Sequence, residues 1–250
     1  MINEIIITLV STAIAAALNF LATKTYSYIT GSRIDFIWRN KYSNLKSLQA
    51  PLEFDELKRR TRIIVIDDED NFPISLFVSD GYSIEKWDSV SDYGKLESGY
   101  YDIIVLDIKG VASHISDDDG LGVLESIKRT NPAQIIIAYS QHSYDLSKAR
   151  FWEMADETIV KPSDFLKIRT IINELINTQF KPERYIETFE RLLQENHISD
   201  KERLILEDKL VKVIKGRIRP NWNELLSFAQ NRPDLMNQLI TIGDTIIKFY

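Results

Sequence analysis

The chain has 250 residues, 44% of them hydrophobic and 27% charged, which is enough apolar material for a folded core. Its net charge of −6 gives no sign of the basic face that nucleic-acid-binding proteins usually carry, so we expect no nucleic-acid partner. The absence of cysteine excludes disulfides and thiolate metal sites, and the three histidines are too widely spaced to suggest a zinc site.

The N-terminal stretch Ile5–Ala22 contains no charged residue and meets the lower length limit for a transmembrane helix. Only Glu4 is charged before it, whereas cations outnumber the single acid Asp35 in the stretch that follows: Lys24, Arg33, Arg39 and Lys41. The positive-inside rule then places the C-terminal side in the cytoplasm. We therefore expect residues 1–23 to be a single-pass anchor in the inner (cytoplasmic) membrane.

Three other interpretations of this stretch stay open. A cleaved signal peptide would need basic residues at its start, which are lacking. A buried helix fits the dilution by Asn19 and small residues, and an interfacial helix would need cations on its polar face. Small and weakly polar residues recur at helical spacing, which favours close helix contacts in lipid and hence a homo-oligomer: Thr8, Thr12, Ala15 and Asn19.

After a mixed linker over residues 24–60, strand-like and helix-like segments alternate through residues 61–178. The predicted strands are Ile63–Ile66, Tyr82–Trp87, Ile103–Leu106, Ile135–Tyr139 and Thr158–Val160. The predicted helices are Phe72–Val78, Asp92–Ser98, Leu121–Lys128, Ser143–Met154 and one that Ser163 or Asp164 caps and that ends near Thr178. This alternation predicts an α/β fold with a doubly wound, five-stranded parallel sheet.

Residues 179–250 show helical periodicity throughout. We predict an all-α region of about four helices, running from Pro182 to Glu195, from Asp200 to Ile214, and onward from Pro220 and from Pro233. No motif assigns it a function, so we interpret it as a partner-binding or dimerising module.

Polar side chains stand where the predicted strands end: Asp67, Asp68, Asp107, Ser140 and Lys161. Ligand sites of open parallel sheets lie beyond the carboxyl ends of the strands, so these side chains can converge. Three carboxylates without a soft ligand suit Mg²⁺. A carboxylate can attack phosphorus, and a hydroxyl and an ammonium group can then bind the transferred phosphoryl group.

Four motifs carry a resemblance to a known family. They are IDDE at Ile66–Glu69, YDIIVLDIK at Tyr101–Lys109, IIIAYS at Ile135–Ser140 and MADETIVKP at Met154–Pro162. With these motifs, residues 61–178 resemble the receiver domain of two-component response regulators, which has the CheY-like variant of the flavodoxin-like fold.

The resemblance implies that Asp107 is the phosphoacceptor. Asp67, Asp68 and Asp107 would hold Mg²⁺ together with the backbone carbonyl of Lys109. Ser140 and Lys161 would bind the phosphoryl group. It also implies a histidine kinase or phosphotransfer protein as the partner, and no enzymatic activity beyond accepting and losing the phosphoryl group.

The sequence departs from the family pattern at two places. The loop after the phosphoacceptor is about five residues longer and lacks the usual proline, and its run Asp117–Asp119 is consistent with a helix cap, with a kinase contact or with an effect on metal affinity. We favour the cap. Thr158 stands at the switch position where the family has an aromatic residue, so the usual coupling between Ser140 and that residue is in doubt.

These observations leave three functions open. The first is a signalling protein whose receiver is phosphorylated on Asp107 and passes its state to the helical tail or to an oligomeric anchor. The second is a receiver-like scaffold or membrane effector that acts through protein contacts and oligomerisation. The third, a phosphohydrolase of the haloacid-dehalogenase class, is disfavoured because such enzymes need an acid where this chain has Lys109.

Overall fold

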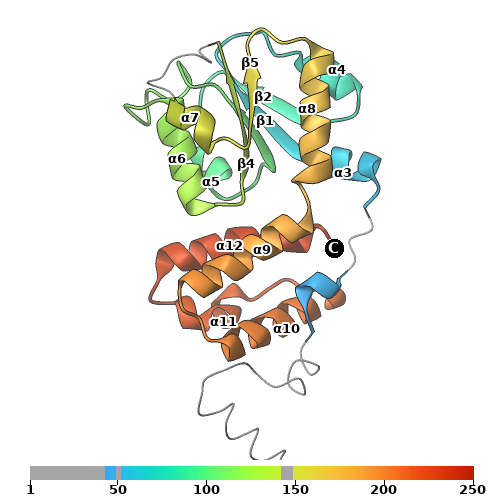
Figure 1. Cartoon of the computed structure of the whole chain (residues 1–250), viewed down its shortest axis with the longest axis vertical. Helices are drawn as coiled ribbons and strands as arrows, with labels where there is room; N and C mark the ends of the chain where they lie inside the picture. Colours follow the sequence, from blue (N-terminus) through green and yellow to red (C-terminus); the bar gives the residue numbers. More distant parts are fainter. Residues whose placement is uncertain (1–42, 49–51, 142–148) are drawn as a thin grey trace, which may run out of the picture.

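A computed structural model describes residues 43–48, 52–141 and 149–250 of the chain (Figure 1). The predicted anchor and its stripe of small residues lie outside these described residues. Among the residues that are described, no helix is both long enough and apolar enough to cross a membrane.

Five parallel strands form one sheet in the order β2-β1-β3-β4-β5. The strands are β1 (Arg62–Ile66), β2 (Ser83–Trp87), β3 (Ile103–Leu106), β4 (Ile135–Ser140) and β5 (Glu157–Val160). Every residue of β3 and β4 is buried, which explains their unbroken apolar runs, because central parallel strands are covered on both faces. The prediction of a doubly wound five-stranded sheet is confirmed.

Helices cover both faces of the sheet (Figure 1). They are α3 (Phe54–Arg60), α4 (Ile74–Ser79), α5 (Tyr93–Glu97), α6 (Gly120–Thr130), α7 (Ala149–Met154) and α8 (Phe165–Thr178). Successive strand residues point to opposite faces, so Val65 packs in the core with α4 and α8, whereas Ile66 packs with α5, α6 and α7. Each face therefore has its own apolar layer.

Two helix starts in the α/β part of the chain refine the predictions. Asp164, not Ser163, caps α8, since its carboxylate accepts a hydrogen bond from the Lys167 N–H at 2.9 Å. The predicted start of α7 at Ser143 lies outside the described residues, and the described helix begins at Ala149.

The tail is helical, as predicted. Its helices are α9 (Pro182–Glu195), α10 (Asp200–Gly216), α11 (Trp222–Leu225) and α12 (Pro233–Lys248), with a 3₁₀ turn η3 (Ser227–Ala229) before α12. A helix follows Pro220, as predicted: α11 begins at Trp222, where the Asn221 side chain accepts a hydrogen bond from the Glu224 N–H and caps the helix.

The tail packs against the end of the sheet where the strands begin. Aromatic rings form the centre of the contact: Phe249, near the C-terminus, lies 4.8 Å from Phe180 and 5.6 Å from Tyr185 between ring centroids. All three side chains are buried and belong to the same apolar cluster as the β-strand residues facing α4 and α8. One hydrophobic core therefore runs from the sheet into the tail.

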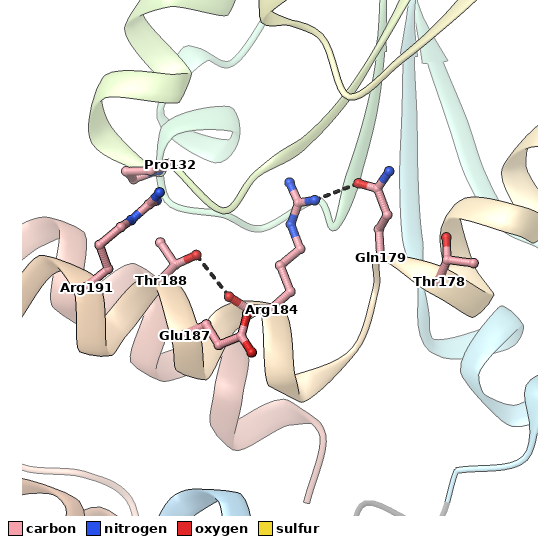
Figure 2. A pocket seen from close by; sticks show the side chains of 7 residues that line it. All are labelled: Pro132, Thr178, Gln179, Arg184, Glu187, Thr188 and Arg191. Carbon is pink, nitrogen blue, oxygen red and sulfur yellow. Dashed lines mark hydrogen bonds between the residues drawn. The ribbon is translucent and has the colours of Figure 1, made fainter.

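Arg184 of α9 contributes polar interactions to this contact (Figure 2). Its guanidinium donates to the Asp156 carboxylate at 2.6 Å and to the Ala133 carbonyl at 3.2 Å, and it also bonds Gln179. Asp156 directly precedes β5, and Ala133 lies just before β4. The neighbouring hollow of about 490 Å³ is lined by seven residues: Pro132, Thr178, Gln179, Arg184, Glu187, Thr188 and Arg191.

The 3₁₀ turn η1 (Leu45–Ser47) of the linker packs on the tail and not on the sheet (Figure 1). Leu45 is fully buried, Lys46 pairs with Glu190 of α9 at 2.6 Å, and the Ser43 N–H donates to Asp208 of α10 at 3.1 Å. The first described residues of the chain therefore lie on the surface of α9 and α10.

Glu207 of α10 gives this contact a pH dependence. Burial, reinforced by the nearby Glu190 carboxylate, raises the pKa of Glu207 to about 6. Because the folded state holds this proton more tightly than the unfolded chain, its ionisation destabilises the fold as the pH rises from about 4.5 to about 6. Glu207→Gln should therefore gain about 1 kcal/mol over the wild type between pH 4 and pH 7, measured by urea unfolding across that range. If the difference in unfolding free energy between Glu207→Gln and the wild type is the same at pH 4 and at pH 7, the pKa of Glu207 is not raised.

Candidate functional site

Three carboxylates meet where β1 and β3 end. One oxygen from each of Asp67, Asp68 and Asp107 lies within 4.8 Å of the others. The sheet register makes this possible, because Ile66 and Leu106, the residues before Asp67 and Asp107, are paired on neighbouring strands. Asp67 is fully buried, Asp107 is nearly so, and Asp68 is exposed, so the cluster opens to solvent on one side.

Lys161 bridges two of these carboxylates. Its Nζ lies 2.5 Å from Asp67 Oδ1 and 2.5 Å from Asp107 Oδ2, and its side chain is 1% exposed. It follows β5, and the Lys161–Pro162 peptide bond is cis. The Tyr139 ring lies 4.9 Å from the ammonium group on its other side. The lysine is thereby fixed directly beside the predicted phosphoacceptor.

The electrostatics of the pair follow from burial and contact. Burial alone would lower the pKa of Lys161, but hydrogen bonds to Asp107 and Asp67 outweigh it and the pKa is raised. The pKa of Asp67 is also raised, because burial there outweighs the contact with Lys161. The lysine is thus charged at neutral pH, and Asp67 is a carboxylate that a further cation would stabilise.

The donor set fits a hard divalent cation. Asp67 Oδ2 is buried and has no hydrogen-bond partner within the described part of the chain, although Oδ1 of the same carboxylate is held by Lys161. An unpaired buried carboxylate oxygen is costly unless a cation or water meets it. All three acids offer oxygen ligands, which is the chemistry that Mg²⁺ prefers.

A hollow of about 210 Å³ lies over the cluster. Its lining residues are Asp68, Glu69, Asp107, Lys109, Gly110, Ser140, Gln141 and Lys161. Ser140, the last residue of β4, is buried beside it, and Lys109 is exposed at its rim. Thr158, in contrast, is an exposed residue of β5 and does not line the hollow.

Asp119 organises the long loop that follows Asp107. Its carboxylate accepts hydrogen bonds from the Gly110 N–H and the Ala112 N–H, both at 2.6 Å. Although Asp119 stands at the N-cap position of α6, its side chain makes no capping hydrogen bond there, and its φ of 51° turns it toward the loop. The helix-cap interpretation of this acidic run is wrong for Asp119, which instead ties the loop together.

Gly110 is a positioning residue that the sequence analysis missed. Its φ of 80° is one that other residues adopt only under strain, and a Cβ atom built there would overlap the carboxylate of Asp68. Gly120 is similar, since a Cβ there would overlap the Asp107 carbonyl. The only sequence signal for Gly110 was its place directly after Lys109, a predicted metal ligand through its carbonyl.

Gly110→Ala should weaken Mg²⁺ binding about tenfold or more, because the methyl group must displace the Asp68 carboxylate. Isothermal titration with Mg²⁺ measures this directly. Gly81→Ala is the matched control: Gly81 has a φ of 86°, but nothing lies within 4 Å of its Cβ position. The control should lose about 1–2 kcal/mol of stability from backbone strain and keep its Mg²⁺ affinity. Equal affinities in the two variants would contradict the role of Gly110.

Glu69 and Gln141 were also missed. The Gln141 amide donates to both carboxylate oxygens of Glu69 at 3.1 Å, and Glu69 lies 3.5 Å from Lys161. These contacts connect the loop after β1 to the residue that follows Ser140. Partners so far apart in the sequence leave no local pattern by which they could have been found.

No protein-family model matches the chain, and no curated protein matches it. Among solved structures, the chain is similar to a two-component response regulator from Clostridium difficile, with 24% identity over 49% of this chain and 99% of that chain and a TM-score of 0.40.

Two further similar structures were solved with ligands. A response regulator of Thermotoga maritima in complex with Mg²⁺-BeF is 30% identical over 46% of this chain and 98% of that chain, with a TM-score of 0.38. The receiver domain of a sensor histidine kinase from Pseudomonas aeruginosa, with a magnesium ion in its active-site cleft, is 17% identical over 47% of this chain and 98% of that chain, with a TM-score of 0.38.

The sheet order 2-1-3-4-5 is that of the flavodoxin-like fold, which CheY shares, and the acidic cluster lies at the carboxyl ends of β1 and β3. The similarity to the solved structures covers about half of this chain.

Proposed function

We propose that this protein is a response-regulator-like signalling protein whose receiver domain accepts a phosphoryl group on Asp107 in a Mg²⁺-dependent reaction. One observation carries the proposal: Lys161 lies 2.5 Å from both Asp67 and Asp107, in a cluster of three carboxylates with a buried oxygen left unpaired. A cation site next to a carboxylate and a fixed ammonium group is what transfer of a phosphoryl group to that carboxylate needs.

The residues have distinct tasks in this reaction. A carboxylate oxygen of Asp107 attacks phosphorus, the new O–P bond forms, and the bond between phosphorus and the donor's nitrogen or oxygen breaks with its electron pair leaving on the donor. Lys161 offsets the charge of the incoming phosphoryl oxygens, and the Ser140 hydroxyl donates a hydrogen bond to one of them. Bound Mg²⁺, held by Asp67, Asp68 and Asp107, would supply further positive charge.

The donor is expected to be a histidine kinase or a phosphotransfer protein, as the resemblance to receiver domains implies. Thr158, an exposed residue of β5, stands where the family has an aromatic switch residue, so the output differs from the usual coupling. The tail and the predicted membrane anchor at residues 1–23 are the proposed recipients of the signal. The scaffold alternative would use the same surfaces without phosphorylation.

Labelling of the full-length protein with acetyl phosphate tests the proposal. The wild type should incorporate phosphate only when Mg²⁺ is present, and EDTA should abolish the label. Asp107→Asn, which keeps the side chain's size, should remain folded and unlabelled. Asp102→Asn is the matched control at the other end of β3 and should be labelled like the wild type. A label that persists in Asp107→Asn would identify another acceptor, and an unlabelled wild type that also ignores beryllofluoride would favour the scaffold.

A further inference from the structure

The C-terminal end of α10 and the turn after it carry a cluster of cations. Between Asp208 and Glu224 the sequence has no acidic residue. We call the basic patch the following six residues: Lys209, Lys212, Lys215, Arg217, Ile218 and Arg219. In a chain with a net charge of −6, such a cluster concentrates positive charge on one region of the surface.

Several of these charges are not neutralised by the fold. Lys212 pairs with Asp208 at 2.6 Å and Lys209 lies 3.6 Å from Glu224. Within the described residues, the other three cations have no carboxylate within 4.0 Å: Lys215, Arg217 and Arg219. All three are exposed. The patch therefore retains a surplus of positive charge that faces solvent.

The apolar residue in the middle of the patch is exposed as well. Helix α10 ends at Gly216, and Arg217 adopts a left-handed conformation with a φ of 49°, so the chain turns sharply there. Ile218 follows and is 61% exposed, between two arginines. An exposed branched aliphatic side chain flanked by cations is the combination that inserts into the boundary of an anionic bilayer.

The position of the patch in the chain supports the same partner. The Ser43 N–H is bonded to Asp208, and Lys212 and Lys215 follow Asp208 at helical spacing, so they lie on the same side of α10. Ser43, the first described residue, therefore lies beside the patch, and 42 residues precede it in the sequence. These residues include the uncharged stretch Ile5–Ala22, which the sequence predicts to be a membrane anchor.

We propose that the basic patch docks on an anionic lipid surface, with Ile218 entering the headgroup region. Nucleic acid is the less suitable partner: among the described residues the aromatic side chain nearest the patch in sequence is Trp222, whose indole N–H is bonded to Asp244 at 2.9 Å and whose ring lies against Gly243 of α12. The docking goes beyond phosphoryl acceptance and does not depend on it.

A fluorescent probe at a single cysteine tests the docking, since the natural chain has no cysteine. Full-length Ile218→Cys, labelled with an environment-sensitive dye, is reconstituted with vesicles of phosphatidylcholine alone or with about 30% phosphatidylserine. The emission should shift to the blue only with the anionic lipid and return toward the aqueous value at about 1 M salt. Leu166→Cys, at a similarly exposed site on α8 (64%), is the control and should not respond.

Charge removal provides the second arm. The triple variant Lys215→Gln, Arg217→Gln, Arg219→Gln should lower the ratio of lipid-facing to water-facing probe about 100-fold. A control that removes three exposed cations elsewhere, at Arg59, Lys167 and Lys201, should leave the ratio unchanged. The proposal is overturned if the Ile218 probe ignores anionic lipid, if the Leu166 probe responds equally, if both triple variants behave alike, or if single-stranded RNA shifts the Ile218 probe more than vesicles do.

Discussion

Lys161→Ala should lower the free energy of unfolding by about 3–5 kcal/mol, because it leaves the buried carboxylates of Asp67 and Asp107 without their shared counter-charge. The loss of stability should become smaller as the pH falls. Burial raises the pKa of Asp67, so this group takes up a proton at low pH and the buried charge that destabilises the variant is removed. Urea unfolding in Mg²⁺-free buffer, at neutral pH and near pH 4, measures both effects.

A double variant shows whether the loss comes from the unpaired charge. Lys161→Ala combined with Asp67→Asn should recover part of the stability, since only the Asp107 carboxylate then remains without a counter-charge. Mg²⁺ should stabilise Lys161→Ala more than it stabilises the wild type, because the variant's carboxylates have no competing cation. Additive losses in the double variant, or equal effects of Mg²⁺, would show that the lysine acts through packing alone.

Phe249→Ala is the second change with a large expected effect. The ring is 3% exposed and packs on Phe180 and Tyr185 where the tail meets the sheet, so its removal should lower the free energy of unfolding by about 3–5 kcal/mol. Leu166→Ala, which truncates an exposed side chain, should change it by less than about 0.5 kcal/mol.

The shape of the unfolding transition is informative in the same experiment. Because one apolar cluster contains residues of the sheet and of the tail, tryptophan fluorescence and far-UV circular dichroism should report a single transition in the wild type and in Phe249→Ala. Two separated transitions would show that the tail unfolds on its own and that the shared core does not couple the two parts.

The strands and the residues at their ends could be predicted because both depend on short stretches of sequence. Unbroken apolar runs such as Ile103–Leu106 are typical of buried parallel strands, and a strand's end fixes where the next side chain stands. This locality is enough to predict that Asp67, Asp107 and Lys161 lie together at one edge of the sheet, and the contacts of Lys161 confirm it. The roles assigned to Ser140, Lys109 and Thr158 rest on the resemblance and stay predictions.

What could not be predicted depends on contacts between distant segments or on backbone conformation. Aspartate is a common helix-capping residue, which is why Asp119 was interpreted as a cap. Its positive φ instead turns the carboxylate toward Gly110. Arg184 has no local signal at all, since its partner Asp156 is 28 residues away in the sequence.

The location of the tail has a consequence for signalling. Arg184 and Phe249 attach it where the strands begin, whereas Asp107 stands where they end. The helices α9–α12 lie at the opposite end of the sheet from the acidic cluster (Figure 1). If Asp107 accepts a phosphoryl group as proposed, an effect on the tail would have to travel along the length of the sheet.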